Sequence, residues 1–159
     1  MRVNEIMTKQ VSCCSADNTL AQAAQLMWDH DCGCLPVYSG DGASRLAGVI
    51  TDRDICMSAL FKGKPLHELH VSDAMSRQLQ TCRPGDSLVD AERTMRQARI
   101  RRLPVVDDEG SLVGMVSLAD LAREAAREKS LSRQEITETE VGDTLAAICQ
   151  PQAQRQLAA

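Results

Sequence analysis

The first recurring pattern along the chain is helical. Apolar residues return three and four positions apart at Leu20, Ala23, Ala24 and Met27. Thr19 precedes this run, and Gln22 follows Thr19 by three residues, which is the spacing of a capping box at a helix start. The pattern predicts a helix that begins at residue 20 and turns one apolar face towards a core. The same face returns at 88–95 behind a weaker cap, Ser87-x-x-Asp90.

Short apolar runs bounded by turn residues predict strands on either side of these helices. The predicted strands cover residues 11–14, 34–38, 46–50, 79–82, 102–106 and 112–116. Gly and Asp at 39–44 and 107–110 are typical of the turns that join paired strands. Further helices are predicted to open at Thr51 and at Ser117. The resulting order is β-α-β-β-α, followed by the same order again.

An internal repeat is the strongest signal in the chain. The segment LPV at 35–37 returns as LPV at 103–105, a separation of 68 residues. After a turn that is two residues shorter, GVITDRD at 48–54 aligns with GMVSLAD at 114–120. Each unit is too small to cover its own sheet, so we expect an α/β fold of two β-α-β-β-α repeats packed sheet to sheet. Their pseudo-two-fold symmetry would create two clefts, and clefts between repeats are common ligand sites.

The repeat divides the chain into four parts. Residues 1–60 form the first repeat, 61–70 a linker rich in Lys, Gly and Pro, and 71–127 the second repeat. Residues 128–159 form a tail whose short apolar stripe predicts one helix. The tail has no counterpart in the first half. Its pattern leaves open whether it docks on its own chain, on a second copy or on another protein.

Composition narrows the class of protein. Hydrophobic residues make up 43% and charged residues 25% of the chain, which is ordinary for a globular protein. A net charge of −4 and an aromatic content of 2% give neither the basic surface nor the stacking platforms of a nucleic-acid binder. No apolar run reaches the roughly 18 residues of a membrane span, and the first residues lack the apolar stretch of a secretion signal. With seven cysteines we therefore expect free thiols in a reducing cytoplasm.

Two segments, both present twice in register, resemble a known family. They are GVITDRDI at 48–55 and GCLPV at 33–37, and the family is the CBS-domain pair, or Bateman module. The resemblance covers residues 1–127. It implies a regulatory module that binds an adenosine-containing ligand, AMP, ADP, ATP or NAD, in the clefts between the repeats. S-adenosylmethionine is the alternative ligand that the same resemblance allows.

Two strand-to-helix corners carry the predicted site. Thr51 and Asp54 lie one helical turn apart at one helix start, and Ser117 and Asp120 lie at the other. A helix start suits a phosphate, and a carboxylate accepts hydrogen bonds from ribose hydroxyls. In the family that this chain resembles, the [Ser/Thr]-x-x-Asp element holds ribose and phosphate. The alternative is that Thr51 and Ser117 only cap their helices, with the aspartates as first-turn charges.

Three arginines are predicted to reach the phosphates. Arg53 lies inside the first corner, where the second has Ala119, so the two clefts are expected to be unequal. Arg101 and Arg102 precede the second LPV segment, and by resemblance these places contact phosphate in some relatives. The first repeat carries no charge at the matching places. The alternative is that these arginines are solvated, with Arg53 paired to Asp52.

The resemblance also assigns the adenine pocket. Pro36 and Val37 occupy the stretch of backbone that lines this pocket in the family, and Pro104 and Val105 are their counterparts. Val37 and Val105 are therefore predicted to contact the base. Proline in both copies also interrupts the strand ladder beside the cleft.

The sequence predicts no catalytic or metal centre. Cys13-Cys14 and Cys32-x-Cys34 fit no common zinc spacing, and His67-x-x-His70 lacks the spacing of a zinc protease. No nucleophile and base pair stands out. CBS pairs also occur inside a nucleotide-synthesising dehydrogenase, but its catalytic barrel of about 250 residues has no counterpart in this sequence. We therefore expect no enzyme activity and no required metal.

The remaining alternative is a structural or protein-interaction module whose clefts stay empty. Both copies retain the hydroxyl and the aspartate of the corner, which favours ligand sensing over empty clefts. By resemblance we also expect a homodimer. The effector protein that responds to the module is not identified by the sequence.

Overall fold

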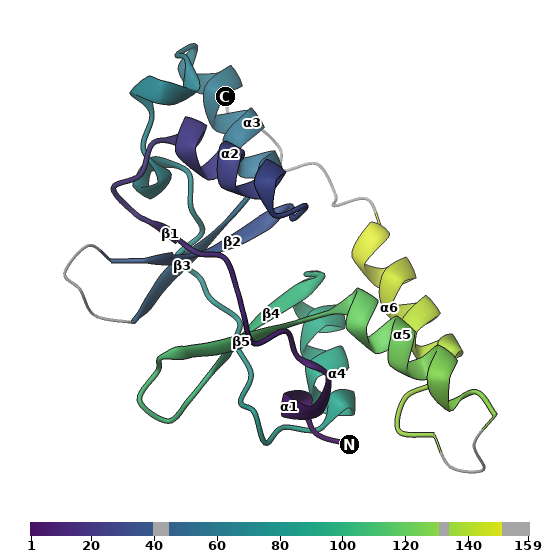
Figure 1. Ribbon diagram of the computed structural model, residues 1–159. Coiled ribbons are helices and arrows are strands. Elements are labelled where there is room, and N and C mark those ends of the chain that lie inside the picture. The colour runs from purple at the N-terminus through teal and green to yellow at the C-terminus, as the bar shows by residue number, and fades with distance from the viewer. Residues whose placement is uncertain (40–44, 131–133, 151–159) are drawn as a thin grey trace. The chain divides into compact units, whose positions relative to one another are not determined.

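The computed structural model describes residues 1–39, 45–130 and 134–150. Its helices and strands follow in the order α1 (Val3–Ile6), β1 (Cys14–Ser15), α2 (Leu20–Asp29), β2 (Cys34–Tyr38), β3 (Leu46–Thr51), α3 (Asp52–Lys62), η1 (Leu66–Glu68), η2 (Val71–Asp73), α4 (Leu88–Ala98), β4 (Arg102–Val106), β5 (Leu112–Ser117), α5 (Leu118–Glu128) and α6 (Glu138–Cys149) (Figure 1). The predicted β-α-β-β-α order is confirmed in the first repeat. The second repeat has the same order from α4 onwards.

The first strand of each repeat is shorter than predicted. β1 covers only Cys14–Ser15, and in the second repeat a single parallel bridge joins Cys82 to Val105. Each pairs with a strand that carries a proline just before the paired valine, Pro36 or Pro104. Because proline has no N–H, the ladder stops beside it. The short runs at 11–14 and 79–82 therefore predicted longer strands than the structure has.

The chain forms two compact units whose boundaries cross those of the repeats. Unit 1 contains Met1–Met7, Pro84–Leu103 and Val116–Ala159, and unit 2 contains Thr8–Arg83 and Pro104–Met115. Unit 2 therefore holds the first repeat from Thr8 onwards together with most of the second repeat's hairpin. Unit 1 holds the helices of the second repeat and the tail.

Strand residues of both repeats pair within unit 2. Arg45 forms an antiparallel bridge with Ser111, and Thr8 forms one with Met115. Thr8 and Met115 exchange two backbone hydrogen bonds of 2.9 Å. The two repeats are thus joined through their strands, in keeping with the predicted α/β repeat fold.

The core of unit 2 lies between one face of the β1-β2-β3 sheet and the helices α2 and α3 (Figure 1). β2 and β3 are antiparallel, with Leu35 opposite Ile50. Neither side chain has exposed surface, and Leu20 from α2 is equally buried. The helix face predicted from the apolar spacing is therefore the face that meets the sheet.

The predicted capping box at α2 is confirmed. The Thr19 hydroxyl accepts a hydrogen bond from the Gln22 N–H at 3.2 Å, and the Gln22 amide oxygen accepts one from the Thr19 N–H at 2.8 Å. Two N–H groups that a helix start leaves without intrahelical partners are satisfied in this way. At α4 the weaker box holds only half of this arrangement, because Asp90 reaches the Ser87 hydroxyl and not its N–H.

The turn predicted at 107–110 is present and is held by one side chain. Asp107 Oδ1 accepts hydrogen bonds from the N–H groups of Glu109 at 3.1 Å and Ser111 at 2.7 Å. Gly110 has φ of 81°, a conformation that favours glycine. The other predicted turn, at 39–44, lies outside the described residues from position 40 onwards.

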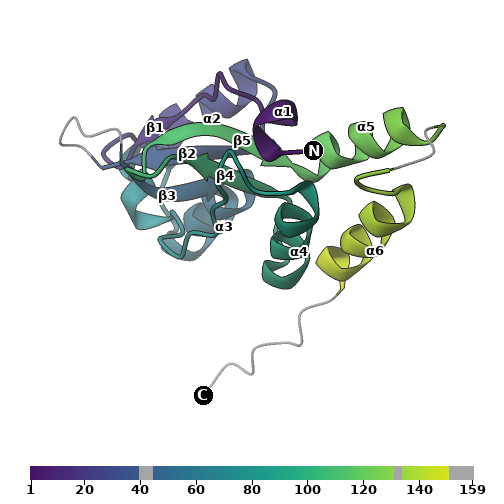
Figure 2. The same cartoon turned by 90° about the horizontal axis from the view of Figure 1, so that it is seen from below.

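Three helices pack together in unit 1. α6 contacts both α4 and α5, and the three lie side by side in Figures 1 and 2. Ile136, just before α6, is almost completely buried, as is Thr144 within it. Of the three dockings that the tail pattern left open, the structure shows the one on its own chain.

Candidate ligand-binding corners

The first corner is a helix cap built by Thr51 and Asp54. β3 ends at Thr51, and α3 begins at the next residue. Asp54 Oδ2 accepts hydrogen bonds from the Thr51 N–H at 2.9 Å and the Thr51 hydroxyl at 2.7 Å. The Thr51 Oγ1 in turn accepts one from the Asp54 N–H at 3.2 Å. The two predicted ligand contacts therefore hold each other.

The second corner has the same geometry. Asp120 Oδ2 accepts hydrogen bonds from the Ser117 N–H at 2.8 Å and hydroxyl at 2.6 Å, and Ser117 Oγ accepts one from the Asp120 N–H at 3.3 Å. Thr51 and Ser117 therefore both cap their helices. Capping does not exclude binding, because each hydroxyl and carboxylate keeps acceptor capacity beyond these bonds.

The N–H groups at the start of α3 already have partners. The N–H of Asp52 donates to the carbonyl oxygen of Gly33 at 3.3 Å, and that of Arg53 donates to the Asp52 carboxylate at 2.7 Å. The Asp54 N–H is taken by the cap. A phosphate at this corner would first have to displace the Asp52 carboxylate, so the helix start is less open to an anion than its position suggests.

The two aspartates differ in their second oxygen. Asp120 Oδ1 forms an ion pair with Arg123, and Asp120 is buried. Met57 stands at the equivalent position in the first repeat. Within the described parts of the chain, Asp54 Oδ1 has no hydrogen-bond partner. Asp54 Oδ1 is therefore open to a ribose hydroxyl, whereas Asp120 Oδ1 already accepts from Arg123 and has less acceptor capacity left.

The arginines occupy different surroundings. Arg53 is exposed, and its link to Asp52 runs through its backbone N–H rather than through its guanidinium. Arg101 and Arg102 are exposed too. The carbonyl oxygen of Arg101 accepts the N–H of Leu118 at 2.9 Å, which places this residue beside the Ser117 corner within unit 1.

The predicted adenine contacts lie in the interior of unit 2. Val37 and Val105 have no exposed surface, and Pro36 and Pro104 are buried as well. The Pro104 carbonyl accepts the N–H of Cys82 at 3.1 Å.

The thiols near β1 are held in their neutral form. Burial raises the pKa of Cys14 to about 12, and the neighbouring thiols of Cys13 and Cys34 add to this shift. Burial also raises the pKa of Tyr38 to about 12, and its hydrogen bond with Cys13 contributes. A protonated thiol is a weak metal ligand and a weak nucleophile. Over the described residues, no three His, Cys, Asp or Glu side chains gather as a metal site would require.

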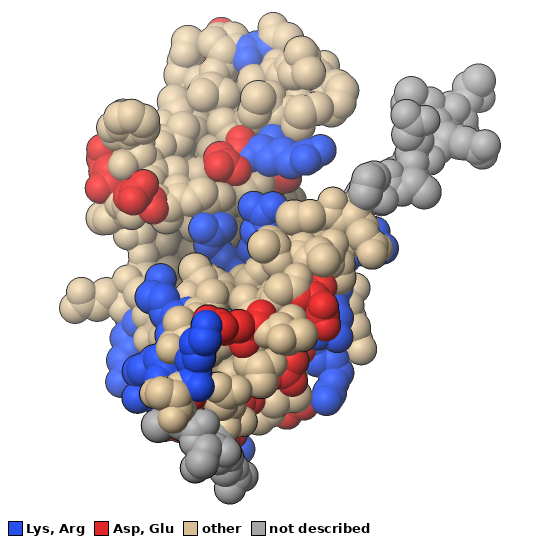
Figure 3. Space-filling model, turned by 90° about the vertical axis from the view of Figure 1, so that its right-hand side faces the viewer, with Lys and Arg blue, Asp and Glu red and all other residues tan. Residues whose placement is uncertain are grey.

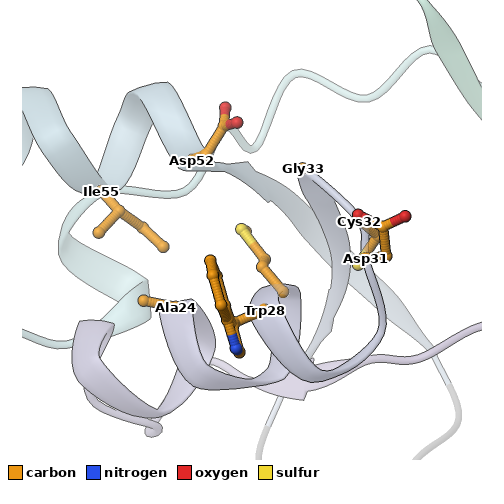
Figure 4. Close-up of a pocket in the computed structure, with 8 residues that line it drawn as sticks. Ala24, Trp28, Asp31, Cys32, Gly33, Asp52 and Ile55 are labelled. Carbon is orange, nitrogen blue, oxygen red and sulfur yellow. The ribbon is translucent and has the colours of Figure 1, made fainter.

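A hollow between α2 and α3 was not predicted. It has a volume of about 420 Å³ and combines apolar and acidic side chains (Figure 4). Its lining includes Ala24, Met27, Trp28, Ile55, Asp31 and Asp52. The signal in the sequence was Trp28, one helical turn beyond Ala24 and next to the buried Met27. In the described parts of the chain, no helix is long and apolar enough to cross a membrane.

Comparison with known proteins identifies the family. The CBS domain family model matches residues 3–60 and 71–127. The chain therefore belongs to the CBS-domain family and contains the tandem pair that its repeat predicted. The CBS domain-containing protein YhcV of Bacillus subtilis is 42% identical over 120 residues, which are 76% of this chain and 82% of YhcV. Hypoxic response protein 1 of Mycobacterium tuberculosis is 32% identical over 149 residues, 94% of each chain.

Solved structures of CBS proteins share the fold. The crystal structure of Hypoxic Response Protein I with two coordinated zinc ions has a TM-score of 0.69 at 32% identity, and covers 77% of this chain and 98% of that one. CBSX2 in complex with AMP has a TM-score of 0.69 at 26% identity, covering 80% and 98%. The CBS pair of MJ0100 in complex with 5-methylthioadenosine and S-adenosyl-L-methionine has a TM-score of 0.67 at 27% identity, covering 77% and 94%.

Some relatives are enzymes that contain a similar pair. Inosine-5'-monophosphate dehydrogenase of Methanocaldococcus jannaschii is 30% identical over 133 residues, 80% of this chain and 25% of the dehydrogenase. The match thus covers the CBS pair and leaves most of that enzyme without a counterpart in this sequence.

Proposed function

We propose that this chain is a regulatory module that binds an adenosine-containing ligand at the two corners. The observation that carries the proposal is the repetition of one hydrogen-bonded arrangement at Thr51 with Asp54 and at Ser117 with Asp120. The same capping geometry occurs at Thr19 with Gln22 and at Thr137 with Glu140, so the two corners are distinguished by their matching positions at the strand-to-helix corner of both CBS repeats. Structures of two related pairs hold AMP or the adenosyl compounds named above, which supports this class of ligand.

Each predicted residue has a proposed role. Asp54 Oδ1 accepts a ribose hydroxyl, and the Thr51 hydroxyl turns from the aspartate towards the ligand. Arg53 and Arg101 supply charge to a phosphate, because their guanidinium groups are exposed and a charge-assisted hydrogen bond contributes about 1.5–3 kcal/mol. Arg102, which opens β4, adds a second guanidinium next to Arg101.

The adenine would lie against the backbone of two short segments. These are the LPV segments that carry Pro36 with Val37 and Pro104 with Val105. Because the valines are fully buried, the base is proposed to contact the carbonyl edge of the strands. Side-chain contacts with the valines require a local opening of unit 2.

AMP, ADP, ATP and NAD are the proposed ligands, and S-adenosylmethionine is the alternative. The exposed arginines favour a phosphate-bearing ligand, whereas a sulfonium carries positive charge and would meet them unfavourably. No bound metal is required in this proposal. A ligand regulates only if it binds one arrangement of the module more tightly than another.

The proposal also covers the domain boundaries, the oligomeric state, the partner protein and the compartment. Residues 61–70 link the repeats 1–60 and 71–127, and 128–159 form the tail. The module assembles as a homodimer, acts on an effector protein in the cytoplasm and performs no catalysis. Its seven cysteines, none of them in a disulfide, suit a reducing compartment. An interaction module with empty clefts is the second candidate, and the repetition of the same hydroxyl and aspartate pair at both corners weighs against it.

A thermal-shift panel tests the proposal. The purified chain is heated with AMP, ADP, ATP, NAD, S-adenosylmethionine and, as control, inosine monophosphate. At about 100-fold excess over Kd, a ligand adds about 2.7 kcal/mol to stability. For a chain of this size that corresponds to a rise in Tm of roughly 5–11 °C. A panel without any shift, repeated by calorimetry, would contradict ligand sensing and favour the interaction module.

A further inference from the structure

The tail helix α6 packs on the second repeat but buries little apolar surface there. It contacts α4 and α5, yet Thr144 is the only buried residue of the helix, every residue of which the structure describes. Leu145 is 46% exposed. Figure 3 views the molecule from the side of α5 and α6, where acidic and basic side chains intermingle. Hydrophobic burial therefore contributes little to the docking of α6.

Polar contacts hold α6 instead. The Thr144 hydroxyl donates to the Glu92 carboxylate and accepts from Arg96 Nε at 3.0 Å, and Arg96 forms an ion pair of 2.8 Å with Glu92. Ahead of the helix, the carboxylate of Glu128, at the end of α5, accepts the N–H of Glu135 at 2.7 Å. A segment with few buried apolar contacts opens at a lower free energy than the core of its unit. We therefore expect α6 to undock more readily than α4 or α5.

The C-terminal end of α6 meets Arg101. Cys149 is the last residue of this helix, and Arg101 Nη2 donates to its Sγ at 3.8 Å. The last carbonyl groups of a helix carry partial negative charge, which a nearby cation stabilises. α6 has acidic residues in its first turn but no basic residue in its last turn. Arg101 therefore supplies the positive charge that this helix end lacks.

Arg101 is at the same time part of the second corner. Its carbonyl oxygen accepts the N–H of Leu118 at 2.9 Å, directly after Ser117. This bond fixes the backbone of Arg101, whereas the direction of its exposed guanidinium depends on the partners within reach. A thiol is a weak acceptor, but a phosphate forms short, charge-assisted bonds with arginine. One guanidinium thus has two competing partners, the end of α6 and a phosphate at the corner.

The first repeat lacks the groups for such a competition. Gly33 stands at the position of Arg101, and Trp28 stands at that of Arg96. Arg101, Ser117 and α6 all belong to unit 1. Competition between the tail helix and a ligand is therefore restricted to the second corner.

We propose that α6 is a regulatory element that competes with the phosphate of the ligand for Arg101. Docked α6 holds the guanidinium at Cys149, and a phosphate bound beside Ser117 and Asp120 takes it over, which loosens the last turn of α6. This rests on the proposed function, from which it takes the phosphate-bearing ligand. Because coupling between two binding events is reciprocal, the ligand weakens the docking of α6 by the factor by which docking weakens ligand binding. Adenosine lacks the phosphate and is not affected.

A charge placed at the end of α6 tests the competition. Cys149→Asp sets a carboxylate against Arg101 and is expected to lower the affinity for AMP about two- to fivefold, the strength of an exposed ion pair, without any change for adenosine. Cys149→Lys gives the helix end its own cation and is expected to raise the affinity for AMP. Thr139→Asp is the matched control, because it adds the same charge about 15 Å away along the helix, beyond the screening length of about 8 Å. Calorimetric titration measures each Kd.

The background of Arg101→Ala separates competition from a direct action on the ligand. In this background Cys149→Asp and Cys149→Lys are expected to leave the affinity for AMP unchanged, since both act through Arg101. Charges that acted on the phosphate directly would keep their effect, and this result would overturn the proposal. Circular dichroism melts establish that each variant is folded.

Hydrogen exchange measures the reciprocal effect on the helix. AMP is expected to speed exchange in the last turn of α6 about two- to fivefold, by the reciprocity of the coupling, whereas adenosine is not. Arg101→Ala should abolish the response to AMP. The amides of α4 serve as the internal control. Exchange in α6 that is the same with and without saturating AMP would overturn the proposal.

The outcomes distinguish this inference from the proposed function. AMP that binds the wild type, Cys149→Asp and Cys149→Lys equally well, while Arg101→Ala weakens it, overturns the competition and leaves ligand sensing standing. If no phosphate-bearing ligand of the thermal-shift panel binds the wild type or Cys149→Lys, both proposals fail.

Discussion

The carbonyl oxygen of Arg101 accepts the N–H of Leu118 at 2.9 Å, which ties the residue before β4 to the first turn of α5. In the first repeat, Gly33 and Asp52 form the same bond at 3.3 Å. The two corners thus have the same backbone hydrogen bond but differ in their side chains. Only the second repeat has an arginine at this position, and only the first carries one, Arg53, within its helix start.

This difference predicts how the basic residues act. Arg101→Ala combined with Arg102→Ala is expected to lower the affinity for AMP about tenfold or more, because charge-assisted bonds to the phosphate are lost. The affinity for adenosine should not change. Calorimetric titration with both ligands measures the two effects. Arg93→Ala, an exposed arginine on α4, is the matched control, and an equal loss for adenosine and AMP would contradict the assignment.

The aspartates are expected to contribute unequally. Asp54→Ala should weaken ligand binding more than Asp120→Ala, because Asp54 has an unoccupied carboxylate oxygen and Arg53 beside it, whereas Asp120 is held by Arg123. Calorimetry on each variant gives the two dissociation constants. Asp54→Asn keeps an acceptor for the Thr51 N–H and so separates loss of the cap from loss of charge. Equal losses for the two alanine variants would reverse this ranking.

The sequence predicted the elements that local chemistry determines. The cap at Thr19, the buried face of Leu20 and the turn at Asp107 follow from residues within a few positions of each other. The corner residues were likewise found as two copies of one motif. Alignment of the copies was enough to place Thr51 and Ser117 at helix starts.

The features that the sequence did not predict depend on contacts between segments that are far apart in the chain. Nothing near Glu92 indicates that Thr144, 52 residues later, will complete its hydrogen bonds. The ion pair between Asp120 and Arg123 was not predicted, because an arginine at this helix position is equally compatible with a solvated side chain. The hollow beside Trp28 is formed by α2 and α3, two helices that are adjacent in space but separated in the chain by the strands β2 and β3. The strand at 11–14 was predicted too long, because the effect of Pro36 on the strand that pairs with it was not considered.

The docking of α6 predicts a specific loss of stability. Thr144→Val keeps the shape of the side chain but removes a buried hydroxyl that bonds Glu92 and Arg96. Loss of one partner of a buried polar group costs about 1–3 kcal/mol. We expect Tm to fall by a few degrees in a calorimetric melt. Thr139→Val, at an exposed position of the same helix, is the matched control and should melt like the wild type.

The acidic cap of α6 should make its docking sensitive to low pH. Hydrogen bonds from the Thr137 hydroxyl and N–H lower the pKa of Glu140 below its usual value. A depressed pKa contributes stability above the unfolded value of about 4.3, and this is lost as the pH falls through the folded pKa. Glu140→Gln should therefore flatten the decline of Tm below pH 5. An unchanged decline in the variant would show that other carboxylates, such as Glu124, account for it.

The buried thiol of Cys14 is expected to make the chain less stable at high pH. Burial raises its pKa to about 12 in the folded chain, whereas an unfolded thiol ionises near 8.5. A raised pKa contributes stability that is complete below about pH 8.5 and is lost as the pH rises towards the folded value. The urea midpoint of the wild type should therefore fall between pH 8 and 10. Cys14→Ala should reduce this slope, while Cys56→Ala, which removes an exposed thiol, should leave it unchanged. If both variants keep the full wild-type slope, the Cys14 thiol ionises as readily in the folded chain as in the unfolded one.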